Sequence, residues 1–330
     1  MSFEVVDGGL ASTIQDAGRS DWAHVGVPPS GPCDPWSLAV ANLLAGSARG
    51  GAAVEMTLVG PTLVARRRTV VGLAGADLGG RVVGGRRLAP GRSHRIEAGE
   101  TIAFPGDGPD PRARAYLALP GGVDVAAVLG SRSTCLAAGF GGYEGRPIRA
   151  GDVLHAGQQD DGPGQDAAAG ERTWPADPWL PVPSDPTVLR VLPGPAPGLE
   201  RIAEQPWRVG SEADRVGIRL DGEVLADGIG GEAVSHGVTW GAIQVPPDGR
   251  PIILGPDHQT TGGYPVVGVV ISADRPILGQ LRPGAGIELR IVGRDEAVAA
   301  LRDREAELTA GAATMRETLR WDELARSAGG

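Results

Sequence analysis

The sequence contains no lysine, so all 31 of its basic residues are arginine. This absence excludes the mechanisms that need an amine side chain: a P-loop lysine, a Schiff-base lysine, a Ser-x-x-Lys nucleophile and a biotinylated lysine. Arginine makes bidentate contacts to carboxylates and phosphates but does not give up its proton. We therefore expect arginine side chains or backbone N–H groups to hold any anion that this protein binds.

Cysteine and long apolar runs are also scarce. Cys33 and Cys135 are the only cysteines, too few for a disulfide scaffold or a zinc knuckle. The N-terminus lacks the basic and apolar regions of a signal peptide, and no run of about 18 apolar residues occurs. We therefore expect a cytoplasmic protein with no membrane partner. A net charge of −9 and a pI near 5.1 argue against a nucleic-acid partner, because such proteins present a basic face.

What is present indicates a mainly β protein. The 53 glycines and 28 prolines punctuate short runs of Val, Ile and Leu, a pattern typical of turn-rich β proteins. Residues 3–15 predict two strands around a Gly8-Gly9 turn. Asp34 and Pro35 predict the N-cap and first position of a helix over residues 36–45.

The length of 330 residues suits two domains. Residues 157–187 are rich in Gly, Pro and acidic residues and have no periodicity, which indicates a boundary. From residue 295 to about 325, Leu and Ala recur at helical spacing among alternating charges, so one or two terminal helices are expected. The predicted domains are an N-terminal β-rich lobe, a linker, a C-terminal lobe and a helical tail, over residues 1–165, 166–187, 188–293 and 294–330.

The first cluster of polar residues lies between residues 13 and 34. Asp34 is interpreted as a helix cap because Pro35 follows it directly. Gln15, Asp16, Arg19 and His24 are interpreted as functional, since a loop of this length more often carries function than not. The alternative for Asp16 is an Asx-turn in an ordinary surface loop.

The second polar cluster runs from Asp257 to Tyr264. Asp257 and Gln259 are two residues apart and would face the same side of a strand. The Thr-Thr-Gly-Gly segment that follows could present hydroxyls and a concave row of backbone N–H groups to an anionic oxygen, or it could be only a turn. Residues 130–134 could bind an oxyanion, although capping of a helix is the favoured interpretation. His236 and His258 have no second ligand at metal spacing, so no metal site is predicted.

Five motifs together resemble one family. They are Thr13-Ile14-Gln15-Asp16-Ala17-Gly18-Arg19, Gly26-Val27-Pro28-Pro29-Ser30-Gly31-Pro32-Cys33-Asp34, Gly130-Ser131-Arg132-Ser133-Thr134, Gly241-Ala242-Ile243-Gln244-Val245-Pro246 and Gln259-Thr260-Thr261-Gly262-Gly263-Tyr264-Pro265. The chain resembles, over residues 3 to 293, the KipA family, also called allophanate hydrolase subunit 2 or the biotin-dependent carboxyltransferase family. Its stand-alone bacterial members form the C subunit of ATP-dependent 5-oxoprolinase.

This resemblance implies two cyclophilin-like β-barrel lobes with few helices. It also implies two partner chains, a KipI-like one (the B subunit) and a LamB-type one (the A subunit), with which 5-oxoproline is hydrolysed to glutamate at the expense of ATP. In urea amidolyase the similar domain transfers a carboxyl group from carboxybiotin to urea, and here any biotin would have to be carried by another chain. A third possibility is a non-catalytic regulator that binds a KipI-type partner.

The polar clusters and the resemblance together give a predicted site for a small-molecule amide. The assigned roles are acid–base chemistry for Asp16, His24 and Asp257; anion holding for Arg19, Arg132 and Arg215; amide orientation for Gln15, Gln244, Gln259 and Thr260; and further substrate contacts for Ser131, Thr261, Gly262, Gly263 and Tyr264. This hypothesis requires the loops that carry Asp16 and Asp257 to line one shared cleft.

Overall fold

The computed structural model describes residues 2–157, 172–175, 183–224 and 231–328, with side chains as far as residue 316. The chain folds into two compact units. Unit 1 comprises Met1–Gly18, Asp34–Leu180 and Ala306–Gly330, and unit 2 comprises Arg19–Cys33 and Pro181–Glu305. Most of the predicted linker, residues 166–187, lies outside the described residues, and the predicted domain boundaries stay a prediction.

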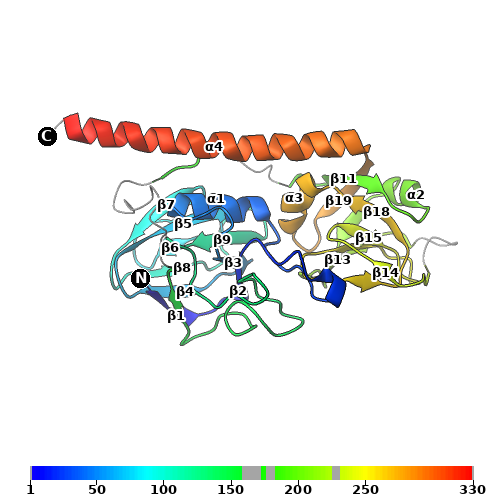
Figure 1. The fold of residues 1–330 in the computed structure, drawn as a ribbon, viewed down its shortest axis with the longest axis horizontal. Coiled ribbons are helices and arrows are strands. Elements are labelled where there is room, and N and C mark those ends of the chain that lie inside the picture. Colours follow the sequence, from blue (N-terminus) through cyan, green and yellow to red (C-terminus); the bar gives the residue numbers. More distant parts are fainter. Residues whose placement is uncertain (1, 158–171, 176–182, 225–230, 329–330) are drawn as a thin grey trace. The chain divides into compact units, whose positions relative to one another are not determined.

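Two five-stranded sheets form unit 1 (Figure 1). One has the order β10-β1-β4-β8-β6 and the other the order β2-β3-β9-β5-β7. The strands are β1 (Ser2–Asp7), β2 (Ala11–Gln15), β3 (Ala53–Thr57), β4 (Thr62–Ala65), β5 (Thr69–Gly75), β6 (Arg81–Val82), β7 (Arg92–Ile96), β8 (Thr101–Ala103), β9 (Arg114–Ala118) and β10 (Val153–His155). A single apolar cluster with residues from both sheets, such as Phe3 and Val54, is the core of this unit.

The two strands predicted around Gly8-Gly9 are confirmed as β1 and β2, but they belong to different sheets. β1 pairs with β4 and β10, whereas β2 pairs with β3. The turn between them therefore carries the chain from one sheet of unit 1 to the other.

Helix α1 (Pro35–Ala45) confirms the predicted helix and its signals. Asp34 is the N-cap, and its carboxylate accepts hydrogen bonds from the backbone N–H and the hydroxyl of Ser37. Gly46 ends the helix in the left-handed conformation. The helix packs on β5, where a Cβ at Gly72 would collide with the backbone of α1. Glycine at this position therefore permits the close approach of helix and sheet.

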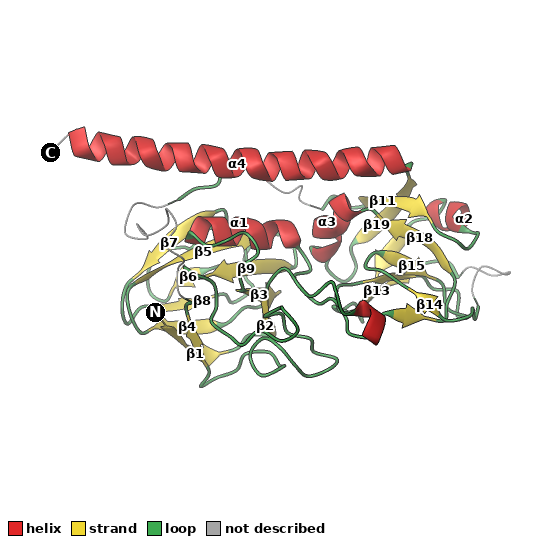
Figure 2. Cartoon of the chain, viewed as in Figure 1, coloured by secondary structure: helices red, strands yellow, loops and turns green. Residues whose placement is uncertain are grey.

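The strands of unit 2 close into a barrel with the order β11-β18-β15-β16-β13-β12-β19, drawn in yellow in Figure 2. They are β11 (Thr187–Pro193), β12 (Trp207–Val209), β13 (Gly217–Asp221), β15 (Ala242–Gln244), β16 (Ile252–Leu254), β18 (Val266–Val270) and β19 (Gly286–Ile291). All pairs are antiparallel except β11 with β19. Trp207 is among the fully buried side chains that fill the barrel.

A small antiparallel ribbon and short helices complete unit 2. The ribbon pairs β14 (His236–Gly237) with β17 (Thr261–Gly262). The short helices are η1 (Ala23–Val25), α2 (Leu199–Ala203), η2 (Ser272–Asp274) and α3 (Arg275–Gly279). Residues 19–33 belong to this unit although they lie between β2 and α1 of unit 1. Ser30 N–H donates to Pro256 O, and the Arg215 guanidinium donates to Gly31 O.

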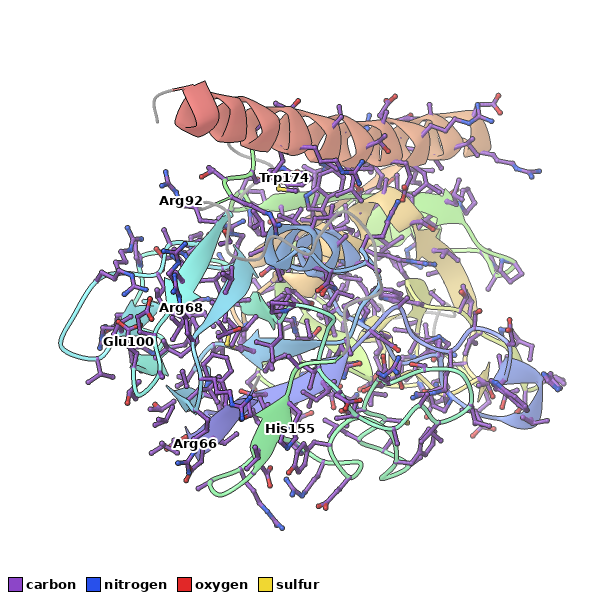
Figure 3. All side chains as sticks on the ribbon, turned by 60° about the vertical axis from the view of Figure 1, so that its left-hand side comes forward. Arg66, Arg68, Arg92, Glu100, His155 and Trp174 are labelled. Carbon is purple, nitrogen blue, oxygen red and sulfur yellow. The ribbon has the colours of Figure 1, made fainter. Side chains whose placement is uncertain are left out.

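The C-terminal region is one helix, α4 (Arg294–Ala328). Within unit 1, Leu308, Ala312 and Met315 of this helix are buried, and their spacing is that of one helical face. The ring of Trp174 leaves no room for a Cβ at Gly311, so helix and ring are in close contact (Figure 3). The part of helix α4 in unit 1 therefore packs against that unit through one face.

The predicted mainly β fold with a few short helices and a C-terminal helix is confirmed. Barrel closure is found in unit 2, whereas the described strands of unit 1 form two separate sheets. Of the helices that the structure describes, none has the length and apolar character needed to cross a membrane.

Candidate functional site

Two of the sequence motifs meet in unit 1 at the Asp16 carboxylate. Its Oδ1 accepts hydrogen bonds from the hydroxyls of Ser131 (2.5 Å) and Ser133 (2.6 Å) and from Gly18 N–H (2.9 Å). Its Oδ2 accepts from the backbone N–H of Arg132 at 2.5 Å. We call Asp16, Ser131, Arg132 and Ser133 the Asp16 cluster. The Asx-turn considered for Asp16 is present, since Gly18 N–H donates to its carboxylate, and the acid–base role stays a prediction.

The interpretation of residues 130–134 as a helix cap is wrong. No helix begins after them in the described part of unit 1 before residue 157; the segment is a loop that Asp16 holds in place. With four donors on its two oxygens, Asp16 fixes the geometry of that loop. This arrangement supports a positioning role for Asp16 in addition to the acid–base role predicted for it.

Gln15 lies beside this cluster and is fully buried. Its Nε2 donates to Thr13 Oγ1 (3.0 Å) and to Thr134 O (3.2 Å), which fixes the orientation of the amide. Its Oε1 is buried and has no hydrogen-bond partner among the described residues. A buried acceptor without a partner is unusual in proteins, so it is a reasonable contact point for a ligand donor.

Arg132 joins the Asp16 cluster to a pocket. Its Nε donates to Val125 O at 3.0 Å, and its own carbonyl accepts from Gly142 N–H at 3.1 Å. Residues 139–145 and Val125 line a pocket of about 500 Å³ that includes the aromatic ring of Phe140. Arg132 is exposed, which leaves its positive charge accessible.

In unit 2, the structure pairs two predicted site residues with each other. Arg215 donates to both oxygens of Asp257, at 2.8 Å from Nε and 3.1 Å from Nη2. Both residues are buried, and Arg215 also donates to Gly31 O at 2.7 Å. The anion expected at Arg215 is therefore the Asp257 carboxylate. This bidentate ion pair fastens the loop of residues 19–33 to the barrel end.

The prediction that Asp257 and Gln259 face one side of a strand is wrong. Strand β16 ends at Leu254, and Asp257 lies in the turn that follows. A proline at position 256 interrupts the strand, because proline cannot donate to a β-ladder. Gln259 instead belongs to a different contact, in which its Nε2 donates to Gln244 Oε1 at 3.4 Å.

Gln244, Gln259 and Gly262, all predicted site residues, come together beside the β14–β17 ribbon. A Cβ at Gly262 would collide with Gln244 Nε2, so the amide of Gln244 lies against the backbone of Gly262. Directly opposite Gly262 in the ribbon is His236. From the sequence, His236 is considered only as a metal ligand; its place in this ribbon is not predicted, because no local pattern indicates which segments pair.

The remaining residues of the polar cluster from Asp257 to Tyr264 lie in or next to the same ribbon. Thr260 O accepts from Val238 N–H at 3.0 Å, and Gly263 O accepts from Ala233 N–H at 2.7 Å. The side chains of Thr261 and Tyr264 are exposed.

The residues predicted in the 19–33 loop differ in exposure. Arg19 is buried, and its backbone N–H donates to Pro29 O at 2.8 Å. His24 is exposed on η1; its Nδ1 is 3.0 Å from Asp21 O, and its ring stacks on Trp22. Its acid–base role stays a prediction.

In unit 2, the pKa of His258 is shifted from its ordinary value, and Arg275 contributes to the shift. Burial lowers the pKa of His258, and the positive charge of Arg275 lowers it further. His258 Nδ1 is 2.6 Å from Gln259 O; because a carbonyl only accepts, Nδ1 carries the hydrogen. Arg275 lies over the ring of Trp240 at 4.8 Å and donates to Trp240 O. The sequence motifs gave no indication of Arg275.

No group of three or more His, Cys, Asp or Glu side chains in the described ranges could hold a metal ion. The Asp16 cluster belongs to unit 1, and Asp257 with the Gln244 contacts belongs to unit 2. The common cleft that the site hypothesis requires stays a prediction.

Comparisons with known proteins agree with these motifs. The carboxyltransferase domain, subdomain A and B, matches residues 25–291. The chain is 32% identical over 309 residues to the 5-oxoprolinase C subunit of Escherichia coli (strain K12), covering 92% of this chain and 95% of that protein. It is 31% identical over 313 residues to urea amidolyase of Lachancea kluyveri, covering 87% of this chain but only 17% of that protein.

A solved structure gives the same result. The K. lactis urea amidolyase superimposes with a TM-score of 0.83 and 28% identity, over 94% of this chain and 20% of that one. The resemblance indicated by the five motifs is confirmed. On sequence and fold together, the chain belongs to the family of the carboxyltransferase domain, subdomain A and B.

Proposed function

We propose that this chain is the C subunit of an ATP-dependent 5-oxoprolinase, which opens 5-oxoproline to glutamate. The observation that carries the proposal is the match to the 5-oxoprolinase C subunit of E. coli, which extends over 92% of this chain and 95% of that protein. The corresponding protein of Haemophilus influenzae matches at 31% identity over 96% of its length. In the proposed assembly this chain acts with a KipI-like partner and a LamB-type partner.

The chemistry of a lactam sets out what such a site needs. An amide carbonyl is a weak electrophile. When ATP is bound, it supplies the activation of the amide carbonyl oxygen. The protein must hold the substrate carboxylate, orient the N–C=O edge and manage the proton of the ring nitrogen. In this proposal Gln244 of unit 2 orients the lactam through its buried amide, and Arg19 of the same unit holds its anionic oxygens.

Arg215 is given no anion-holding role in this proposal, because Asp257 already occupies its guanidinium. Asp257 in turn is fixed by that pair and positions the 19–33 loop. Arg132 offers a nucleotide an exposed cation, and Val125, whose carbonyl accepts from Arg132 Nε, lines a pocket of about 500 Å³ together with Phe140. We assign Arg132 to the phosphate oxygens of ATP on that basis.

The alternative function is transfer of a carboxyl group from carboxybiotin to urea or a similar amide. The TM-score of 0.83 with the K. lactis urea amidolyase favours it. Urea and a lactam present the same N–C=O edge, so both would use the same contacts. Because these 330 residues contain no lysine, biotin would be attached outside them.

The test is to reconstitute the chain with its KipI-like and LamB-type neighbours and to measure glutamate release from 5-oxoproline with and without ATP. ATP-dependent release that requires all three chains supports the proposal. Transfer of carboxyl to urea from a carboxybiotin carrier, without 5-oxoproline turnover, supports the alternative. Assembly with the KipI-like chain with neither activity would indicate a regulatory binding protein.

A further inference from the structure

His236 presents a buried hydrogen-bond acceptor. Its Nδ1 lies 3.1 Å from Val234 O. A carbonyl oxygen only accepts, so Nδ1 carries the hydrogen, and in the neutral ring Nε2 is a lone-pair acceptor. Nε2 is buried and has no hydrogen-bond partner among the described residues. Buried nitrogens of this kind nearly always have a partner, which points to a ligand donor.

Gln244 presents a buried donor. Its Oε1 accepts from Gln259 Nε2 at 3.4 Å, and this contact sets the orientation of the Gln244 amide. The opposite end, Nε2, is buried without a hydrogen-bond partner in the described chain. An NH₂ group only donates. Gln244 is therefore complementary to His236, one side chain offering a donor and the other an acceptor.

The β14–β17 ribbon places these two groups on the same face. His236 and Gly262 are directly opposite each other, and opposite residues of an antiparallel pair point their side chains to the same side. A Cβ on Gly262 would point at Gln244 Nε2. The His236 side chain and the Gln244 amide therefore lie on one side of the ribbon.

A small pocket adjoins this face. It has a volume of about 390 Å³ and is lined by His236 together with Pro195, Pro197, Pro265 and Val266. Its walls are mostly apolar rings and methyl groups, and His236 supplies an imidazole. This combination of apolar walls with a few placed polar atoms is typical of small-molecule sites.

We propose that His236 Nε2, in the lining of this pocket, and Gln244 Nε2, on the same side of the β14–β17 ribbon, form an acceptor–donor pair that recognises the cis N–H and C=O edge of a small amide. A five-membered lactam presents N–H and C=O side by side on one edge, so it satisfies both groups at once. His236 is then a substrate-binding residue that accepts the amide N–H. The proposal deepens the 5-oxoprolinase function and rests on it for the substrate class.

The test uses the full chain and two probes, 2-pyrrolidinone and N-methyl-2-pyrrolidinone, which differ only at the amide nitrogen, where a methyl group replaces the hydrogen. Affinities are measured by ligand-observed NMR titration for the wild type, H236F and Q244L. The control is H155F, which changes the exposed histidine at the end of β10 (Figure 3). Thermal unfolding confirms that each variant is folded, and H236Q, which keeps an acceptor, replaces H236F if the latter does not fold.

The wild type and H155F are expected to bind 2-pyrrolidinone about tenfold more tightly than its N-methyl analogue. H236F should bind both probes equally, H236Q should keep part of the preference, and Q244L should weaken both probes about tenfold. Equal binding of the two probes by the wild type, or an undiminished preference in H236F, overturns the proposal. Lactam selectivity without glutamate release in the reconstituted assay would reject the proposed function but leave this inference standing; the reverse result would reject the inference alone.

Discussion

The substitution Gly262→Ala tests the arrangement at the β14–β17 ribbon most directly. Gly262 does not need a left-handed backbone, so alanine introduces no φ strain. Its Cβ, however, would lie well inside 3.0 Å of Gln244 Nε2, with Val238 Cγ1 at 3.3 Å and Gln244 Cδ at 3.4 Å. The amide is the end of a flexible side chain, so it must turn away and lose its contact with Gln259.

Two magnitudes follow from this displacement. Overpacking of this kind costs about 1–3 kcal/mol of unfolding free energy. Loss of one well-placed donor to the ligand costs about 1.4 kcal/mol, equivalent to a tenfold weaker affinity for 2-pyrrolidinone. We expect both effects in G262A, measured by urea unfolding and by NMR titration.

The neighbouring Gly263→Ala is the matched control. There the nearest atoms to an added Cβ are Ala233 O at 3.5 Å and Ser235 Oγ at 3.6 Å, which is ordinary contact. G263A should therefore keep the affinity of the wild type within about twofold. If G262A and G263A bind the probe equally well, the Gln244 amide does not contact the ligand and the reasoning is refuted.

Three further predictions concern the rest of the chain. D16N should lower the unfolding free energy by about 2–4 kcal/mol in urea titrations, because the carboxylate accepts four hydrogen bonds; the exposed D21N should change it by less than about 0.5 kcal/mol, and equal effects would contradict a structural role for Asp16. R215M should lower the unfolding free energy by about 3–5 kcal/mol in the same urea titrations, because it leaves Asp257 buried and unpaired. The double variant R215M/D257L should lower the unfolding free energy by less than the sum of the two single variants. Strict additivity of the three values would argue against the ion pair. Burial lowers the pKa of His258 below its ordinary 6.5, so protonation favours the unfolded chain, and stability should fall as the pH drops from about 6.5 through the folded-state pKa. Urea midpoints measured at about pH 7.5 and 5.5 should therefore show a smaller loss of stability in H258N than in the wild type. An equal loss of stability in both would exclude His258 as its source.

Local signals predicted local structure well. Asp34, Pro35 and Gly46 gave the bounds of α1 because capping depends only on neighbouring residues. Asp16, Ser131 and Arg132 are all residues of the predicted site, and the structure joins them, although helix capping was the favoured interpretation of residues 130–134. The sequence did not indicate that serine hydroxyls and a backbone N–H, rather than a substrate, surround the Asp16 carboxylate.

What escaped prediction depends on distant pairing. Arg215 and Asp257 are 42 residues apart, and each was chosen as an isolated charge, so their neutralisation of each other was not foreseen. His236 acquires its significance only from the register of β14 with β17, which is a tertiary choice. Arg275 lies outside every motif, and only packing against Trp240 draws attention to it.

The order of segments along the chain has a consequence for protein engineering. The polypeptide leaves one unit and enters the other after Gly18, after Cys33, after Leu180 and after Glu305. A truncation near residue 180 would therefore remove part of α4 from the first unit and separate residues 19–33 from their barrel. Halves expressed separately should be insoluble, and only co-expression of complementary pieces could restore a native molecule.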